Sequence, residues 1–300
     1  MSAVDKSIVE LRHPSGSRAQ VYIYGATVTA FYAANEPTRN LLFLSKKAIL
    51  DGSKPIRGGI PLVFPVFGAV DKFPNHGFAR IYKWNLNQIE ESSGGDENLT
   101  VATFSLDVTD EIKTMYPHAI FLKYVVELSA LTLTTAIHIE NKSNGEISFQ
   151  ALLHTYLTVD DVRNDGVVVE GLKGLTYHDK VAAEEKIEER DTLTIAQETD
   201  NVYANAGSPI VVHMKRTDGK KQVVTIEKEA SVKSGTSHVL QPSDIVVWNP
   251  WVDKAKSLSD FGDDEYLTML CVEPGRVSQR QQLPAKHTFT LQQTIKVSVL

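Results

Sequence analysis

The sequence predicts an all-β fold, a large antiparallel β-sandwich or a related closed-sheet architecture with a few short helices. Hydrophobic and polar residues alternate over many segments, which is the period of a strand with one buried face. Turn residues separate these segments at short spacing, as is typical of sandwiches and barrels. Strand-like and helix-like segments do not alternate regularly along the chain, and this argues against a doubly wound fold.

The clearest strand lies at residues 131–140, where Leu131, Leu133, Ile137 and Ile139 share one face and polar residues occupy the other. A C-terminal segment repeats this pattern, with apolar residues at 289, 291, 295 and 297. The other predicted strands are residues 19–24, 28–32, 99–106, 121–128, 147–159, 167–170, 209–213, 223–227, 245–248 and 267–273.

Helical segments are few and short. We expect them at residues 46–50, 110–116 and 253–261, none with a long stripe of period 3.6. Residues 90–98 read as a polar hairpin loop, and residues 182–191 as a loop or a short exposed turn. Because no Pro/Gly/Ser-rich linker divides the 300 residues, we expect one domain over residues 1–300.

Composition excludes several classes of protein. A hydrophobic fraction of 42% and a net charge of only -6 are typical of a globular chain rather than a disordered one. Lys and Arg number 31 against 37 Asp and Glu, so we expect no nucleic-acid surface. The N-terminal segment is charged and lacks an apolar region, and no run approaches the ~20 apolar residues of a spanning helix. We therefore expect no membrane partner and a cytoplasmic location.

The segment 56–80 is the first candidate for chemistry. Arg57 is followed by Gly58 and Gly59, which let the backbone approach a ligand, and a guanidinium can form two hydrogen bonds to a phosphate or carboxylate. Asn75, His76 and Arg80 then form a dense polar group within the same segment. The alternative is a proline-rich crossing loop whose arginines only bind carbonyl groups.

His154 and Glu273 are the next candidates. His154 shares a strand face with Gln150 and Tyr156, which fits the floor of a polar cleft, although a lone strand histidine is by default a surface or hydrogen-bonded residue. Glu273 ends the apolar run 267–272, where burial would raise the carboxyl pKa toward neutrality and suit a general base. The alternative for Glu273 is a strand-end carboxylate turned to water.

Other polar residues give weaker signals. Asp200 could accept a hydrogen bond from a sugar hydroxyl or make an Asx-turn, and Trp248 and Trp251 could stack on a sugar or lie in the core. A single cysteine, Cys271, argues against an internal disulfide framework and against a Cys-based zinc site, and the histidine spacings indicate no metal ligands. We expect no bound metal.

Taken in order, five motifs resemble those of the hexose-6-phosphate mutarotases (glucose-6-phosphate 1-epimerases) of the galactose mutarotase-like superfamily. They are IRGGIPLVFPVFG, FPNHGFAR, LLHTYL, WNPW and CVEPG, and they span most of the chain. The resemblance implies a β-supersandwich fold and interconversion of the α and β anomers of an aldohexose 6-phosphate, with glucose 6-phosphate as the expected substrate.

The resemblance also implies roles for individual residues. Its catalytic histidine and glutamate fall on His154 and Glu273. Its substrate contacts fall on Arg57, Asn75, Arg80 and Asp200, with Asn75 standing where relatives often have Gln. We also expect His76 to bind substrate, by a hydrogen bond to the sugar or by supporting the developing charge. Glu273 would take the proton of the C1 hydroxyl while His154 protonates the ring oxygen, and the roles reverse on closure.

This reaction transfers no electrons or groups, so we expect no cofactor. The expected partner is a small-molecule sugar phosphate, and we expect a monomer. The competing hypotheses are a mutarotase of a non-phosphorylated aldose, a non-catalytic sugar-phosphate-binding protein and a purely structural β-sandwich.

Overall fold

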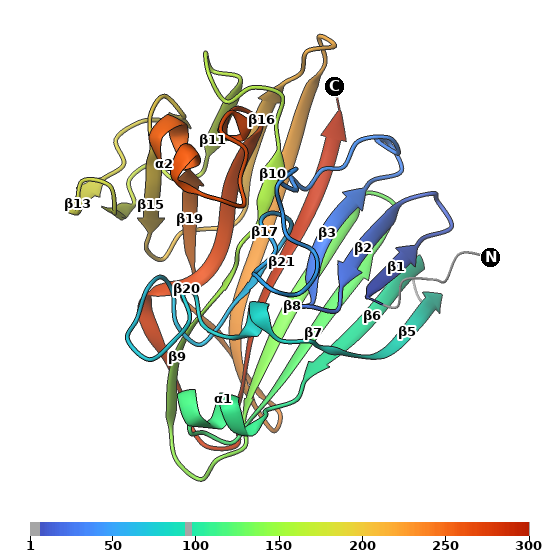
Figure 1. The fold of residues 1–300 in the computed structure, drawn as a ribbon, viewed down its shortest axis with the longest axis vertical. Coiled ribbons are helices and arrows are strands. Elements are labelled where there is room, and N and C mark those ends of the chain that lie inside the picture. Colours follow the sequence, from blue (N-terminus) through green and yellow to red (C-terminus); the bar gives the residue numbers. More distant parts are fainter. Residues whose placement is uncertain (1–6, 94–97, 300) are drawn as a thin grey trace.

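Three antiparallel β-sheets make up most of the molecule, shown as a ribbon in Figure 1. The computed structural model describes residues 7–93 and 98–299. The two large sheets pack face to face around one apolar core, where the rings of Phe149 and Phe289 meet with centroids 5.4 Å apart. The predicted all-β sandwich with few helices is therefore confirmed.

The ten-stranded sheet has the order β14-β11-β16-β17-β21-β8-β7-β6-β5, and β18 pairs with β17 outside that path. Its strands are β5 (Asn85–Ser93), β6 (Asn98–Leu106), β7 (Ile120–Leu128), β8 (Thr132–Asn141), β11 (Val167–Glu170), β14 (Thr192–Thr194), β16 (Ile210–Lys215), β17 (Lys221–Ser234), β18 (Ser237–Gln241) and β21 (Thr288–Val299). The alternation predicted for residues 131–140 is confirmed, because Leu133, Ile137 and Ile139 of β8 are buried in the core.

The eight-stranded sheet has the order β13-β12-β15-β19-β20-β9-β4, and β10 pairs with β20. Its strands are β4 (Leu62–Val63), β9 (Ile147–Leu153), β10 (Tyr156–Thr158), β12 (Thr176–Asp179), β13 (Glu184–Ile187), β15 (Thr199–Tyr203), β19 (Asp244–Asn249) and β20 (Met269–Leu283). Successive side chains of a strand point to opposite faces of its sheet. Val247 of β19 and Val272 of β20 accordingly join the core between the two large sheets.

A three-stranded sheet accompanies the ten-stranded one. It contains β1 (Ile8–Arg12), β2 (Arg18–Tyr22) and β3 (Thr27–Tyr32). The hydroxyl of Thr100 on β6 donates to the carbonyl of Arg12, and the hydroxyl of Ser17 donates to the carbonyl of Ser129. These bonds fix the small sheet beside β6 and β7.

The helices are α1 (Asp110–Met115) and α2 (Trp251–Ser257), with 3₁₀ turns η1 (Ala79–Ile81) and η2 (Glu265–Thr268). The helix predicted at 110–116 is confirmed, and the hydroxyl of Thr109 caps it. Helix α2 begins two residues before the predicted start, because the side chain of Asn249 accepts the N–H of Trp251. No helix forms at 46–50, where the Glu265 carboxylate binds the Lys46 N–H and a turn results.

Two strand predictions next to the candidate site are wrong in extent. The strand predicted at 147–159 breaks at His154 and Thr155, because the His154 N–H turns to the carbonyl of Pro61. The strand predicted to end at Glu273 continues to Leu283, so Glu273 lies inside β20 rather than at its end. The apolar run at 267–272 is buried from Met269 onward, as predicted for a strand covered on both faces.

The loop predictions are confirmed in part. Strands β5 and β6 form a hairpin in which Ser93 pairs with Asn98, and residues 94–97 of the predicted loop lie outside the described part. The segment 182–191 is not only a loop, because β13 forms within it and pairs with β12.

Candidate active site

Strand register brings the candidate side chains to one face of the eight-stranded sheet. Asp200 of β15 pairs with Trp248 of β19, Trp248 pairs with Cys271 of β20, and Cys271 pairs with Tyr156 of β10. These four residues form a row across adjacent strands. Because a strand has period two, the residues two positions away from each of them belong to the same face.

His154 and Glu273 occupy the next row on this face. Glu273 pairs with Val246 of β19, two residues from the row through Cys271. His154 lies two residues before Tyr156, and the Val272 N–H bonds the Thr155 carbonyl, which continues the β10–β20 register toward Glu273. The histidine and the glutamate therefore meet although 119 positions separate them in sequence.

A cavity of about 310 Å³ lies over this face. Six of the seven predicted site residues line it: Arg57, Asn75, His76, His154, Asp200 and Glu273. Trp248 and Val246 also line it from the sheet, and loop residues Phe67 to Ala69 line it from the side of His76. The volume lies within the range of about 300–1,000 Å³ that is typical of small-molecule sites.

His154 and Glu273 form a buried pair in this cavity. The Nδ1 atom of His154 lies 3.3 Å from Oε1 of Glu273, and the two residues are 7% and 1% exposed. The ring of Tyr156 stacks on the imidazole with centroids 4.7 Å apart, while Trp248 meets the imidazole edge-on. Packing on two sides fixes the orientation of the imidazole.

Burial shifts both pKa values toward the neutral forms. The pKa of Glu273 is raised well above its ordinary value by burial and then by the nearby charge of Asp200. The pKa of His154 is lowered well below its ordinary value by burial and then by His76 and Arg80. Between the two shifted values the pair holds one proton, and both shifts favour its place on Glu273.

The loop that carries His76 fixes that imidazole as a neutral donor. The Gly68 N–H donates to Nδ1 of His76, so the remaining proton of a neutral ring is on Nε2. Burial, followed by Arg80 and Lys180, lowers the pKa of His76 well below its ordinary value. Gly77 is required beside it, because a Cβ there would lie 2.1 Å from the carbonyl oxygen of Phe64.

Three cations line the cavity, and two of them are paired with carboxylates. Arg57 binds Asp260 at 3.1 Å, and Lys180 binds Asp200 at 3.0 Å. Lys254 of α2 is the third, and its ammonium has no ion pair with any residue in 7–93 or 98–299. Neither Lys180 nor Lys254 was predicted: Lys180 stands far from the motifs, whereas Lys254 lies three residues after WNPW and could have been found there.

Comparison with known proteins gives a direct family match. The aldose 1-epimerase family matches residues 7–296, nearly the whole chain. This chain belongs to the aldose 1-epimerase family. It is a family of isomerases, and the predicted resemblance to the mutarotases is confirmed.

Individual family members agree with this assignment. A protein of Cenchrus ciliaris named "Putative glucose-6-phosphate 1-epimerase" is 35% identical over 278 residues, which are 90% of this chain and 78% of the relative. A protein of the same name from Escherichia coli is 30% identical over 294 residues, 97% of this chain and 90% of the relative. The crystal structure of a "putative mutarotase" from Salmonella typhimurium has a TM-score of 0.79 at 27% identity, covering 97% of this chain and 90% of that one.

Arg80 is the one predicted site residue of this family member that does not line the cavity. It is buried behind the loop, and its Nη2 donates to the carbonyl of Asn75 at 2.7 Å. Burial, followed by the charge of Arg57, lowers its pKa to about 10. Arg80 supports the segment that presents Asn75 and His76 and adds positive charge behind it.

The structure corrects the interpretation of Gly58 and Gly59 as points of ligand approach. Neither lines the cavity. A Cβ at Gly58 would lie 2.4 Å from the carbonyl oxygen of Phe43, and a Cβ at Gly59 would lie 2.1 Å from that of Val28. The two glycines allow the chain to cross its own backbone closely, and so place Arg57.

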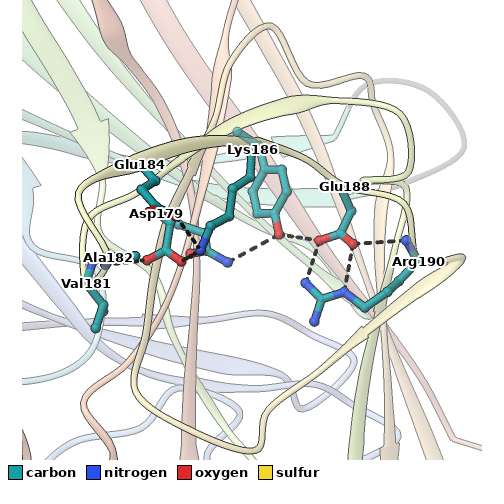
Figure 2. A network of polar contacts seen from close by, with 9 residues as sticks. Asp179, Val181, Ala182, Glu184, Lys186, Glu188 and Arg190 are labelled. Atoms are coloured by element: carbon teal, nitrogen blue, oxygen red, sulfur yellow. Dashed lines mark hydrogen bonds and ion pairs between the residues drawn. The ribbon is translucent and has the colours of Figure 1, made fainter.

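A second cavity, of about 450 Å³, lies beside the hairpin β12–β13. Its charged groups satisfy one another, as Figure 2 shows: Lys186 binds Asp179 at 2.6 Å, and Arg190 binds Glu188 at 2.7 Å. The hydroxyl of Tyr203 also donates to Glu188. In the smaller cavity, by contrast, Oε2 of Glu273 has no hydrogen-bond partner among the described residues.

Within residues 7–93 and 98–299, no helix has the length and apolar character that crossing a bilayer requires.

Proposed function

We propose that this member of the aldose 1-epimerase family interconverts the α and β anomers of an aldohexose 6-phosphate, with glucose 6-phosphate as its substrate. The observation that carries the proposal is the buried pair of His154 and Glu273, which faces a cavity with three lining cations. The names of the relatives from Cenchrus ciliaris and Escherichia coli support the choice of sugar phosphate.

Anomer exchange requires one proton to leave the C1 hydroxyl and another to reach the ring oxygen. A carboxyl with a raised pKa and an imidazole with a lowered pKa hold one proton between them, and their nearest atoms lie 3.3 Å apart. The form of the pair that reacts has this proton on His154, as a carboxylate and an imidazolium. Glu273 then takes the O1 proton while His154 protonates O5, and the C5–O5–C1 ring opens by cleavage of the O5–C1 bond.

Ring closure reverses these roles. The aldehyde rotates about the C1–C2 bond, and O5 attacks the other face of C1. His154 takes the O5 proton back while Glu273 returns a proton to O1, so the enzyme ends with the proton count with which it began. The neutral His76, with its proton on Nε2, is placed to donate a hydrogen bond to a sugar oxygen.

The cations that line the cavity support a substrate that carries a phosphate group. Arg57 is held by Asp260 and also donates to the hydroxyl of Tyr156, so it presents a fixed guanidinium to the cavity. Lys254 brings a further positive charge to the cavity from α2, with no ion pair to any described residue. A phosphate dianion beside these two groups gains charge-assisted hydrogen bonds that a free hexose does not. Asn75 and Asp200 remain to contact sugar hydroxyls.

Magnetisation-exchange NMR between the two anomers tests the proposal. We expect the protein to accelerate exchange of glucose 6-phosphate far more than exchange of glucose or galactose at equal concentration. Equal acceleration with and without phosphate would show a mutarotase of non-phosphorylated aldoses. Binding of glucose 6-phosphate without any acceleration would show a non-catalytic sugar-phosphate-binding protein.

Substitution of the pair is the matching prediction for mechanism. We expect His154→Ala and Glu273→Gln each to lower kcat by about 10²–10⁴-fold, because each removes one half of the proton transfer. Circular dichroism and thermal melting establish that the variants remain folded. A folded variant that keeps more than a tenth of the wild-type kcat would show that the chosen pair is wrong.

A further inference from the structure

The catalytic pair lies next to a third residue with metal-binding chemistry. Cys271 and Glu273 are two apart on β20 and therefore share a face of the sheet, while His154 lies opposite on the chain that enters β10. One ligand atom from each of these three residues lies within 4.8 Å of the other two. The sequence gave no sign of this group, because Cys271 and Glu273 lie 117 and 119 positions from His154.

Two atoms of this cluster have unused bonding capacity. Nδ1 of His154 and Oε2 of Glu273 are buried without a hydrogen-bond partner among the residues that the structure describes. Cys271 is a free, buried thiol. Buried polar atoms are normally satisfied, and each exception requires an explanation such as catalysis or an ion.

The donor set matches zinc better than a hard cation. Zn²⁺ takes thiolate, imidazole and carboxylate ligands, and three protein ligands with one open position are typical of accessible zinc sites. Metal–ligand bonds of about 2.0–2.3 Å place tetrahedral ligand atoms about 3.5 Å apart. Shifts of about 1 Å in side-chain position would therefore close the cluster around an ion, and the cavity supplies the open fourth position.

The charges of the complex also balance. One thiolate and one carboxylate neutralise the two charges of the ion, so the buried site carries no net charge. A neutral complex is the arrangement that a desolvated pocket tolerates best. Binding releases the thiol proton, together with the one proton shared by His154 and Glu273, to the solvent.

We propose that His154, Cys271 and Glu273 form an inhibitory site for a soft divalent cation, with Zn²⁺ as the best match. An ion bound there occupies both proton-transfer groups, so it excludes the productive sugar complex. The inhibition half of this inference rests on the proposed function, whereas metal binding itself does not.

Titration of the metal-free protein with Co²⁺ tests binding without any activity measurement. We expect one equivalent of Co²⁺ to produce a thiolate-to-cobalt charge-transfer band in the near ultraviolet and visible bands typical of a four-coordinate ion, both abolished by Zn²⁺. Cys271→Ala removes the thiolate, so the charge-transfer band disappears and Zn²⁺ binds at least about tenfold more weakly. Absence of the charge-transfer band in the folded wild-type protein would overturn the proposal.

Anomer exchange provides the second measurement. We expect Zn²⁺ to inhibit competitively with the sugar phosphate and EDTA to restore activity. Cys271→Ala should keep its activity within about threefold while losing this inhibition. Val272→Ala is the matched control, because Val272 neighbours Cys271 but faces the core between the sheets; it should remain fully Zn²⁺-sensitive.

The outcomes separate the two proposals. Equal Zn²⁺ inhibition of wild type and Cys271→Ala would place the inhibitory ion elsewhere and overturn the inferred site. A wild-type protein that binds Co²⁺ through Cys271 but does not accelerate anomer exchange would instead retain the metal site and refute the proposed function.

Discussion

Burial of His154 and Glu273 determines the pH range in which the pair can act. A carboxyl in water is ionised and an imidazole in water is half-protonated near neutral pH, so an exposed pair would lose its shared proton as pH rises through about 6.5. In this site the carboxyl pKa is raised and the imidazole pKa is lowered, mainly by burial. The pair therefore holds one proton over the pH range between the lowered pKa of His154 and the raised pKa of Glu273.

These shifts explain why kcat should fall at both low and high pH. When pH falls below the lowered His154 pKa, the pair gains a second proton and has no base; when pH rises above the raised Glu273 pKa, it loses its only proton. We expect the acid limb of the kcat profile to lie below 6.5, the ordinary pKa of the imidazole, and the alkaline limb to lie above 4.5, the ordinary pKa of the carboxyl, with kcat flat between the two limbs. The profile is measured as kcat at saturation, because the substrate phosphate itself titrates near pH 6. An acid limb centred at 6.5 would contradict the lowered His154 pKa.

Helix α2 contributes one residue to the site. Lys254 lines the cavity from the helix, and Leu258 lines it from the position directly after the helix ends. Lys256 lies between them in sequence and does not line it. The helix thus offers a cavity lysine and a matched lysine outside the cavity.

These two lysines give a direct test of phosphate recognition. We expect Lys254→Met to raise KM for glucose 6-phosphate by about tenfold, because a charge-assisted hydrogen bond is worth about 1.5–3 kcal/mol and part of it is lost to solvent screening. Exchange of a non-phosphorylated hexose should not change. Lys256→Met should behave as wild type in both assays; an equal rise in KM in both variants would indicate a general loss of charge rather than a contact.

The pattern of apolar residues predicted many strands of the eight-stranded sheet, but it did not predict how those strands pair. Alternation and apolar runs located β19 and the start of β20, and they singled out His154 and Glu273 as candidates. The edge strand β13 and its neighbour β12 carry mostly polar residues outside the core, so no alternation marked them. The pairing of distant strands depends on tertiary packing, and it alone brings Lys180 and Cys271 to the same site as the predicted residues.

At the scale of the whole molecule, the core between the two large sheets connects residues from both ends of the chain. One apolar cluster contains Val9 near the start and Val297 near the end. This continuity supports the prediction of one domain over residues 1–300. The monomeric state and the cytoplasmic location stay predictions.

The contact of Phe289 with Phe149 tests how strongly this core holds the sheets together. We expect Phe289→Ala to lower the free energy of unfolding by about 3–5 kcal/mol, because it removes a fully buried ring and leaves a cavity. Phe121→Ala is the control, since Phe121 is 41% exposed, and it should cost less than half as much. Urea unfolding measures both. A small effect at Phe289 would mean that the two sheets are held by other contacts.

The floor of the cavity belongs to paired strands, whereas Arg57, Lys180 and Lys254 reach it from loops and from α2. In the proposed function, proton transfer and phosphate binding are therefore encoded in separate stretches of the gene. A chimera that exchanges the segment around α2 between family members would keep the catalytic pair of one parent and take the α2 lysine of the other. Insertion of a single residue before Glu273 in β20 would instead turn the carboxylate into the core and abolish the catalyst in one step.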